Sequence, residues 1–242
     1  MNTELKNFYT DDVAQKREDL FKNSAFQNDT QQEFINTIGI YIKDKYKILD
    51  IGTGNGYVLR EIRQSFPTLN LDFVGIDNSL SMLDKAYRFL GVKYIYCNNE
   101  KTPFEEQVFN IITAKNVTRF DANELYRILK EGGVFIMREY AEAKGLVEVS
   151  NIFKHRLIRS RSVTFYKHQL EEAGFLILKV KLLQTKKTFR NIEELITTVK
   201  SFPYIKDFSS SDEDLIKNSF KDKLTITSDP FILVAKKIGK FK

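Results

Sequence analysis

The stretch from Ile48 to Gly56 constrains the fold of this chain more than any other. An apolar run ends in the acidic residue Asp50, and glycines then follow at every second position, at Gly52, Gly54 and Gly56. A helical pattern begins directly after the last glycine. Glycine lets the backbone turn sharply and lets a ligand come close to it, because no Cβ stands in the way. The segment therefore predicts a strand, a ligand-binding turn and a helix of an α/β protein.

A second acidic residue, Asp77, ends another short apolar run roughly 20 positions beyond the glycines. A carboxylate at the end of the second strand of an α/β sheet can accept hydrogen bonds from ribose hydroxyls. The dinucleotide-binding pattern is Gly-x-Gly-x-x-Gly, whereas here the third glycine comes one residue earlier and Tyr57 takes its place. The sequence therefore predicts a nucleotide-like ligand held by a different loop.

The glycine loop with its preceding acid, followed in register by Asp77, resembles the class I S-adenosylmethionine-dependent methyltransferases. The resemblance covers residues 47–139. Two positions depart from the family's pattern, since Asn110 stands where an Asp is often found and Glu131 where a proline is common. The resemblance implies an enzyme that transfers methyl groups and uses S-adenosyl-L-methionine as its cofactor.

The order of predicted elements is that of an alternating α/β protein. Strands are expected at 47–51, 71–76, 93–97, 109–114, 134–138, 175–183 and 231–235. Helices are expected at 56–66, 79–90, 164–173 and 122–129, the last of these ended by Gly132 and Gly133. The resemblance implies a seven-stranded, mostly parallel Rossmann-like sheet in the order 3-2-1-4-5-7-6, flanked by helices, with the last strand antiparallel.

Further helices are expected before the first strand and between the last two strands. The first 45 residues carry one helix to about residue 22 and a second one capped by Asp29. An insertion at 186–229 carries two more helices, at 191–201 and 212–221, before the last strand. We therefore expect an N-terminal helical lid, 1–45, and a methyltransferase domain, 46–242, that includes the insertion.

Composition narrows the class and the location of the protein. The 242 residues are 42% hydrophobic and 29% charged, as in an ordinary globular protein. Cys97 is the only cysteine, so no intrachain disulfide can form, and no apolar run reaches membrane-spanning length. We expect a cytoplasmic protein with no membrane partner. Because the chain has two histidines and one cysteine, we also expect no metal site.

Positive charge is concentrated late in the chain. The formal net charge is +6, and residues 151–190 hold ten Lys or Arg against two acids. Such a concentration favours an anionic partner over a merely solvated face. The densest part is Arg156, Arg159 and Arg161, whose planar guanidinium groups suit carboxylates and phosphates.

Ligands of open α/β sheets bind beyond the carboxyl ends of the strands. By resemblance, the loop after the first strand holds the methionine and ribose parts of the cofactor, Asp50 reaches its amino group, and Asp77 takes the ribose hydroxyls. Asn98 and Asn99 would meet the adenine amino group, although a polar turn also accounts for them. The predicted cofactor-binding residues are Asp50, Gly52, Thr53, Gly54, Asn55, Gly56, Asp77, Asn78, Met82, Asn98, Asn99 and Lys115.

The methyl acceptor is expected beside the fourth and fifth strands. Glu139 could orient an amine or act as a base, or it could pair with Arg138 instead. His155 could act as a general base, a common role of imidazole groups, although a surface histidine in a basic run is the simpler interpretation. The predicted catalytic residues are Asn116, Glu139 and His155, and the predicted substrate-binding residues are Tyr9, Arg17, Tyr140, Arg156, Arg159 and Arg161.

Three functions fit the sequence. The first is methyl transfer to N or O of a small-molecule or peptidic metabolite that carries an anionic group. The second is methylation of ribosomal or transfer RNA, because aromatic residues interleave with the basic ones over 151–190 and can stack on bases. The third is a non-catalytic cofactor-binding protein. The sequence does not fix the oligomeric state.

Overall fold

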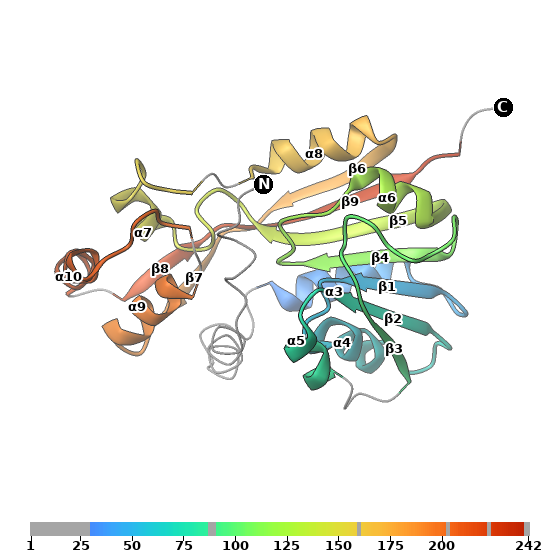
Figure 1. The fold of residues 1–242 in the computed structure, drawn as a ribbon, viewed down its shortest axis with the longest axis horizontal. Coiled ribbons are helices and arrows are strands. Elements are labelled where there is room, and N and C mark those ends of the chain that lie inside the picture. Colours follow the sequence, from blue (N-terminus) through green and yellow to red (C-terminus); the bar gives the residue numbers. More distant parts are fainter. Residues whose placement is uncertain (1–29, 87–90, 159–160, 202–203, 222–223, 240–242) are drawn as a thin grey trace. The chain divides into compact units, whose positions relative to one another are not determined.

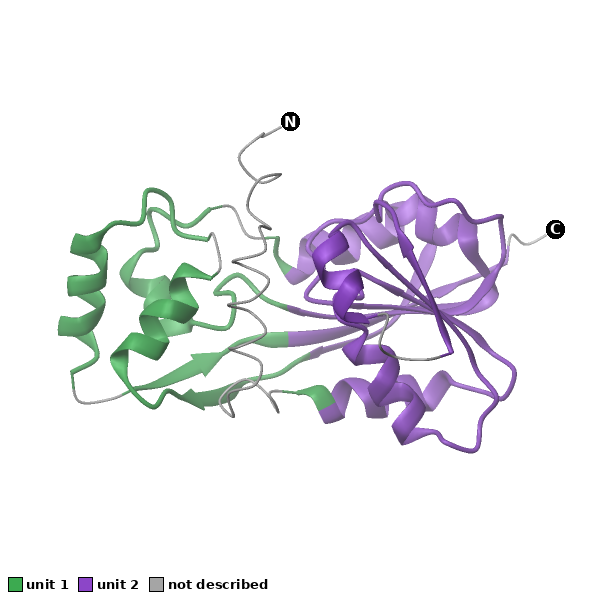
Figure 2. Cartoon of the chain, turned by 60° about the horizontal axis from the view of Figure 1, so that its bottom comes forward, with its two compact units in different colours: residues 1–31, 140–162, 182–230 green, residues 32–139, 163–181, 231–242 purple. Residues whose placement is uncertain are grey.

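The computed structural model describes residues 30–86, 91–158, 161–201, 204–221 and 224–239 (Figure 1). The predicted helix ending near residue 22 and the predicted cap Asp29 lie outside these residues. The chain divides into two compact units, each built from separate stretches of sequence (Figure 2). Unit 1 comprises residues 1–31, 140–162 and 182–230, and unit 2 comprises 32–139, 163–181 and 231–242.

A seven-stranded sheet with the order β3-β2-β1-β4-β5-β9-β6 dominates unit 2 (Figure 1). The order and the antiparallel last strand confirm the predicted fold class, with β9 as the seventh strand of the prediction. The strands are β1 (Lys47–Ile51), β2 (Asp72–Asp77), β3 (Val92–Tyr96), β4 (Phe109–Lys115), β5 (Leu129–Tyr140), β6 (Phe175–Leu182) and β9 (Pro230–Lys237). The flanking helices are α3 (Gln31–Tyr41), α4 (Tyr57–Ser65), α5 (Leu80–Ala86), α6 (Ala122–Ile128) and α8 (Val163–Glu172).

The central strands are apolar on both faces, as expected of a parallel sheet covered by helices. In β1, Ile48, Leu49 and Ile51 are fully buried, and the strand pairs in parallel with β2 on one side and β4 on the other. Burying each such side chain stabilises the fold by about 1.5–3 kcal/mol. This burial fixes the carboxyl end of β1, where Asp50 and the glycines begin.

The two adjacent glycines near residue 132 do not end a helix, contrary to the prediction. Helix α6 already ends at Ile128, and β5 begins at the next residue. The pairing between β4 and β5 jumps from Phe109 opposite Leu129 to Ile111 opposite Val134, so residues 130–133 bulge out. A bulge needs residues that tolerate unusual backbone angles and close approach, which is why glycine occurs there.

Unit 1 has a hydrophobic core of its own, which includes Leu146, Phe153, Leu195 and Ile216. Its elements are α7 (Val147–Ile152), β7 (Thr185–Thr188), α9 (Ile192–Lys200), α10 (Ser210–Ser219) and β8 (Thr225–Ser228). The two helices predicted for the insertion are present as α9 and α10. Asn191 caps α9 by accepting a hydrogen bond from the Glu194 backbone N–H at 2.9 Å.

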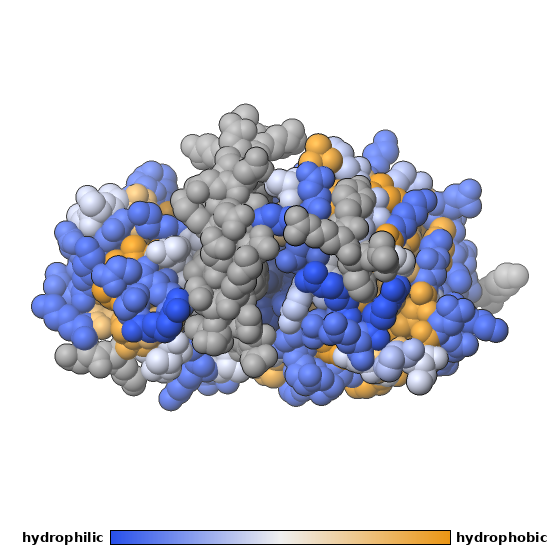
Figure 3. Space-filling model, turned by 90° about the horizontal axis from the view of Figure 1, so that it is seen from below, coloured by the Kyte–Doolittle hydropathy of each residue, from blue (hydrophilic) through white to orange (hydrophobic). Residues whose placement is uncertain are grey.

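Three elements of unit 1 were not predicted. They are the short helix α7 and the antiparallel pair β7–β8, whose residues Thr188 and Thr225 face each other from distant parts of the chain. The predicted boundary between a lid, 1–45, and a domain, 46–242, stays a prediction. No helix in the described part of the chain is long and apolar enough to span a bilayer. The described surface in Figure 3 is largely hydrophilic, with apolar patches between polar ones.

Candidate functional site

The glycine loop joins β1 to α4 in unit 2. Gly52, Gly54 and Gly56 have φ angles of 61°, 55° and 75°, which lie in the left-handed region that favours glycine. The loop is tied to the end of β2, because the Thr53 backbone N–H donates to the Ile76 carbonyl at 2.9 Å. The sequence-predicted turn is therefore present, and it lies beside the strand that carries Asp77.

Steric contacts also require glycine in this loop. A Cβ on Gly52 would lie 2.6 Å from Cγ2 of Val117, a residue that follows β4. A Cβ on Gly56 would overlap the hydroxyl of Tyr94 on β3. Val117 and Tyr94 were not predicted as site residues, because nothing in their own sequence surroundings reveals that they line the loop.

Asp77 binds the backbone of the glycine loop through its carboxylate. Its Oδ2 accepts a hydrogen bond from the Gly54 backbone N–H at 2.8 Å, and its Oδ1 accepts one from the Ser79 backbone N–H at 2.9 Å. Each carboxylate oxygen has a second lone pair, so Asp77 can still accept hydrogen bonds from a ligand. A role of Asp77 toward ribose was expected from the sequence, whereas its bond to the loop backbone was not.

Asp50 is buried at the carboxyl end of β1, with 1% of its surface exposed. Its Oδ1 accepts a hydrogen bond from Oγ1 of Thr113 at 2.7 Å. Burial raises the pKa of Asp50 to about 7, against the lowering effect of the Thr113 hydrogen bond. The Thr53 side chain and Lys115 also lower it, whereas Asp77 adds to the rise. The group therefore changes its charge near neutral pH.

Thr113 was missed by the sequence analysis. It lies on β4 with its Cα directly paired to that of Asp50, and it is fully buried. The available signal was a polar residue between Ile112 and Ala114 in the sequence that forms β4. That signal is weak, because threonine is common in strands for its shape alone.

Buried polar atoms without a hydrogen-bond partner gather around the loop. Among the described residues they include Oδ2 of Asp50, Oγ1 of Thr53 and Oδ1 of Asn99. Leaving such an atom unsatisfied costs about 1–3 kcal/mol, so native proteins rarely do so without a reason. A polar ligand that reached these three atoms would satisfy them. The residues present therefore fit a nucleotide-like cofactor.

Of the other predicted cofactor-binding residues, some lie beside the glycine loop and one lies in an exposed turn. Asn99 lies beside the loop, with its Nδ2 3.9 Å from the Cβ position of Gly52. Asn98 is exposed, and its Oδ1 accepts a hydrogen bond from the Glu100 backbone N–H at 3.0 Å, which is a polar turn. The Met82 methyl carbon lies 3.0 Å from the Cβ position of Gly54.

Three more of these residues lie around the same loop. Asn55 belongs to the loop and is partly exposed, and Asn78 is exposed at the end of β2. The Lys115 ammonium lies 5.0 Å from the centre of the Tyr57 ring, at the first turn of α4. A cation over an aromatic face is stabilised, which holds Lys115 near the loop.

The predicted catalytic residue Asn116 is hydrogen-bonded to a side chain of the neighbouring strand β5. It has a φ of 58°, and its Oδ1 accepts a hydrogen bond from Nη1 of Arg138 at 2.6 Å. Arg138 and Glu139 are both 2% exposed at the carboxyl end of β5. Successive residues of a strand point to opposite faces, which is why Arg138 reaches Asn116 and not its neighbour Glu139. The structure thus gives Asn116 a structural partner.

The remaining predicted residues that the structure describes belong to unit 1. Both terminal nitrogens of Arg156 donate to the Asp212 carboxylate, the longer of these bonds being 3.2 Å. This ion pair raises the pKa of Arg156 and lowers the pKa of Asp212. His155 is exposed, and Arg161 is partly exposed. Tyr9, Arg17 and Arg159 lie outside the described residues.

Tyr140 belongs to unit 1 and is 9% exposed. Its hydroxyl accepts a hydrogen bond from Nζ of Lys187 at 2.9 Å. Lys187 lies on β7 and is itself buried, and the sequence analysis did not single it out. Tyr140, a predicted substrate-binding residue, therefore has a cationic partner.

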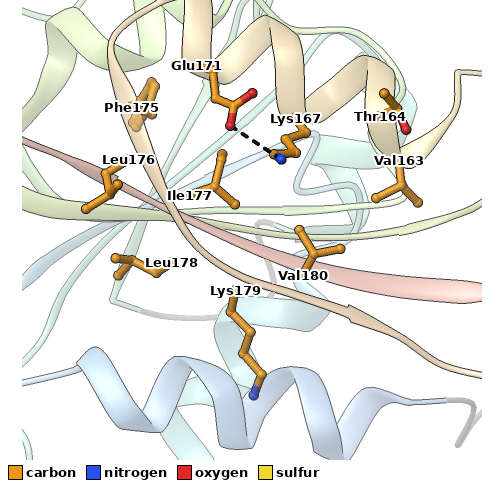
Figure 4. A pocket seen from close by; sticks show the side chains of 10 residues that line it. All are labelled: Val163, Thr164, Lys167, Glu171, Phe175, Leu176, Ile177, Leu178, Lys179 and Val180. Atoms are coloured by element: carbon orange, nitrogen blue, oxygen red, sulfur yellow. Dashed lines mark ion pairs between the residues drawn. The ribbon is translucent and has the colours of Figure 1, made fainter.

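A surface groove lies elsewhere in unit 2, between α8 and the edge strand β6 (Figure 4). Its polar rim includes an ion pair between Lys167 and Glu171, whose atoms are 3.6 Å apart. In the sheet, β6 is separated from β1 by β4, β5 and β9. The groove is therefore a different place from the glycine loop.

The sequence matches the family described as methyltransferase domain over residues 48–133, which include the glycine loop, Asp50, Asp77 and Thr113. Residues 48–133 are a methyltransferase domain. The match accords with the fold, since the sheet order is that of the class I enzymes. It also accords with the place of the loop, Asp50 and Asp77 at the carboxyl ends of the first two strands.

Known proteins similar to this methyltransferase domain include a carboxy-S-adenosyl-L-methionine synthase of Nautilia profundicola, 27% identical over 54% of this chain and 60% of that protein. A ubiquinone/menaquinone biosynthesis C-methyltransferase of Xanthomonas oryzae is 41% identical over 42% of this chain and 45% of that protein. The similarity thus spans about half the length of these relatives.

A solved structure of similar fold is phosphoethanolamine N-methyltransferase 2 of Haemonchus contortus, in complex with phosphomonomethylethanolamine and S-adenosylhomocysteine. Its TM-score is 0.61 at 20% identity, and the alignment covers 97% of this chain and 59% of that one. This likeness shows that the fold extends beyond residues 48–133.

Proposed function

We propose that this protein is an S-adenosyl-L-methionine-dependent methyltransferase that acts on N or O of a small-molecule or peptidic metabolite carrying an anionic group. The observation that carries the proposal is the gathering of unsatisfied polar atoms of Asp50, Thr53 and Asn99 around a glycine loop. A protein that only needed a strand-to-helix turn would gain nothing from leaving them unsatisfied.

The chain's own residues would hold and orient the cofactor. The cofactor supplies a methyl group on a positively charged sulfur, which is already reactive toward a nucleophile. Asp77 would accept hydrogen bonds from the ribose hydroxyls while its bond to Gly54 keeps the loop in shape. Asp50, once ionised, would face the positively charged amino group. Catalysis would then rest mainly on positioning and on the exclusion of water.

Glu139 is the residue that we assign to the acceptor. It is buried at the carboxyl end of β5, the strand that neighbours β4. A carboxylate in such a place can orient an amine or take up the proton that an attacking N–H or O–H must lose. Its neighbour on β5, Arg138, is held by Asn116, so the two strand ends form one connected polar group.

The small-molecule class is supported by the named relatives and by charge. One relative is named for synthesis of a modified cofactor, one for C-methylation in quinone biosynthesis, and the similar solved structure holds a phosphorylated amine. The excess of Lys and Arg over residues 151–190 suits an acceptor with a carboxylate or phosphate. Methylation of carbon is a second candidate, favoured by the 41% identity to the C-methyltransferase.

The RNA alternative loses its main support in the structure. Its aromatic residues had to be free to stack on bases. Phe153, Tyr166, Phe175 and Phe189 are all at most 4% exposed, whereas Phe165 alone is 42% exposed. Four of these five rings are therefore core residues of their units.

The test of the proposal is transfer of a labelled methyl group from S-adenosylmethionine into separate pools of small molecules, peptides and RNA. We expect label in the small-molecule or peptide pool and expect negatively charged acceptors to be preferred. Label in the RNA pool alone would overturn the acceptor class. Tight cofactor binding without transfer to any pool would favour a non-catalytic role.

A further inference from the structure

One buried contact of the domain joins a hydroxyl on β4 to the carboxylate of Asp50 on β1. Thr113 on β4 and Asp50 on β1 lie directly opposite each other, and both are at most 1% exposed. The Thr113 hydroxyl is 2.7 Å from Oδ1 of Asp50 and 3.4 Å from the Leu49 carbonyl oxygen. A hydroxyl has one proton to donate, and the shorter distance gives it to the carboxylate.

We propose that Thr113 is a positioning residue for the cofactor, because its hydroxyl fixes one oxygen of Asp50 and leaves the other oxygen directed to the ligand. The inference rests on the proposed function. Oδ2 of Asp50 is buried and accepts no hydrogen bond of ordinary geometry from the described residues, although the nearby Thr53 side chain lowers the pKa of Asp50. The bond to Thr113 restrains the rotation of the carboxylate, which keeps Oδ2 available for a positively charged or hydrogen-bonding group.

The same bond helps to keep Asp50 ionised in a buried place. Desolvation favours the protonated acid, whereas a hydrogen bond donated to the carboxylate favours the charged form. The charges and titratable groups that act on Asp50 are Asp77 on β2, Tyr94 on β3 and Lys115 on β4. Loss of the Thr113 hydroxyl would leave these groups in place and remove a hydrogen bond that favours the ionised form of Asp50.

Thr113→Val is the decisive variant, because valine keeps the shape and removes the hydroxyl. Thr113→Ser is its matched control, since serine keeps the hydroxyl. The first measurement follows the carbon-13 signal of the Asp50 carboxyl across pH in the ligand-free protein. We expect the midpoint to rise by roughly 0.5–1 pH unit in Thr113→Val, the shift that one hydrogen bond of ordinary strength produces, and to stay near wild type in Thr113→Ser.

The second measurement is calorimetric titration with S-adenosylhomocysteine at pH 7 and pH 8.5. We expect affinity to fall about 5- to 10-fold in Thr113→Val at pH 7, with part of the loss recovered at pH 8.5, where Asp50 is ionised again. A purely structural role would not restore affinity with pH. If Thr113→Val does not fold, Thr113→Ala tests the same hydroxyl.

The outcomes separate this inference from the proposed function. If wild type binds the ligand but the hydroxyl-free variant keeps the same titration midpoint and the same affinity, Thr113 has no positioning role and the proposed function stands. If wild type does not bind the ligand, the proposed function fails and this inference fails with it. A raised midpoint with pH-dependent loss of affinity supports both.

Discussion

The Asp77 carboxylate accepts a hydrogen bond from the Gly54 backbone N–H at 2.8 Å, and this bond joins the end of β2 to the loop after β1. The two acidic residues that the sequence analysis read as cofactor ligands therefore have different local partners. Asp77 binds the loop backbone, whereas Asp50 binds a side chain on β4. The loop is thus shaped before any ligand is present, which lowers the entropy cost of binding.

Asp77→Ala should weaken cofactor binding and loosen the loop. The variant loses the brace to Gly54 and an acceptor for ribose hydroxyls, so we expect affinity to fall about 10- to 100-fold, as for hydrogen bonds to a charged group of about 1.5–3 kcal/mol. Calorimetric titration with S-adenosylhomocysteine measures this affinity. Asp72→Ala, at the exposed start of β2, is the control and should bind normally. Equal affinity in both variants would contradict this role.

Gly56→Ala should destabilise the domain more than Gly132→Ala does. Both glycines have left-handed φ angles, 75° and 74°, so both variants carry backbone strain of about 1–2 kcal/mol. Only at Gly56 does a Cβ also overlap another group, the Tyr94 hydroxyl, whereas nothing lies within 4 Å of it at Gly132. Overpacking adds about 1–3 kcal/mol.

Urea denaturation of the two glycine variants gives the difference in the free energy of unfolding. Adding Tyr94→Phe, which removes the clashing hydroxyl, should recover part of the loss in Gly56→Ala. Equal destabilisation at the two glycines would show that the Tyr94 contact has no effect.

Asp50→Asn should stabilise the ligand-free protein at pH 8 and have little effect at pH 4. Burial raises the pKa of Asp50 to about 7 in the folded state, above its value of about 3.9 in the unfolded chain. The folded state therefore binds the proton more tightly than the unfolded chain does. The contribution of this proton to the free energy of unfolding is fully present below about pH 4 and is lost as the pH rises through 7.

The expected gain for Asp50→Asn at pH 8 is on the order of 2–4 kcal/mol in the free energy of unfolding. It should appear between pH 4 and 7 and level off above. Urea denaturation across this range measures it, and the same variant should bind the cofactor weakly. A stability difference that does not vary with pH would mean that Asp50 titrates normally.

Substitutions at Arg156 and Asp212 distinguish a structural role of Arg156 from a role in substrate binding. Because the guanidinium is already bound by the Asp212 carboxylate, Arg156→Ala should lower the melting temperature as Asp212→Ala does, and the double variant should lower it little further. Thermal melts of the four proteins measure the coupling. An unchanged melting temperature with a raised substrate KM would instead place Arg156 at the acceptor.

The fold was predictable because its strongest signals are local. The bounds of β1 follow from an apolar run that ends in Asp50, and the capped helix α9 follows from Asn191. The pair β7–β8 was not predictable, since its strands are short and their pairing joins distant segments. The glycines at the start of β5 were misinterpreted because a bulge and a helix end make the same demand on the backbone.

The candidate site could be predicted only where the neighbouring sequence indicates the role of a residue. Gly54 and Asp77 could be assigned from motif and order along the chain. The role of Thr113 depends on the register between two strands, and the partner of Arg156 lies far away in sequence. Sequence pattern cannot supply such contacts, because they arise from tertiary packing.

We expect the glycine loop of this methyltransferase domain to bind S-adenosyl-L-methionine. The most direct measurement is calorimetric titration of the wild-type protein and of Asp77→Ala with S-adenosylmethionine under the same conditions. We expect saturable binding to wild type with one site per chain, and binding at least about 10-fold weaker in the variant. Absence of binding to the folded wild-type protein, or equal binding to both proteins, would contradict it.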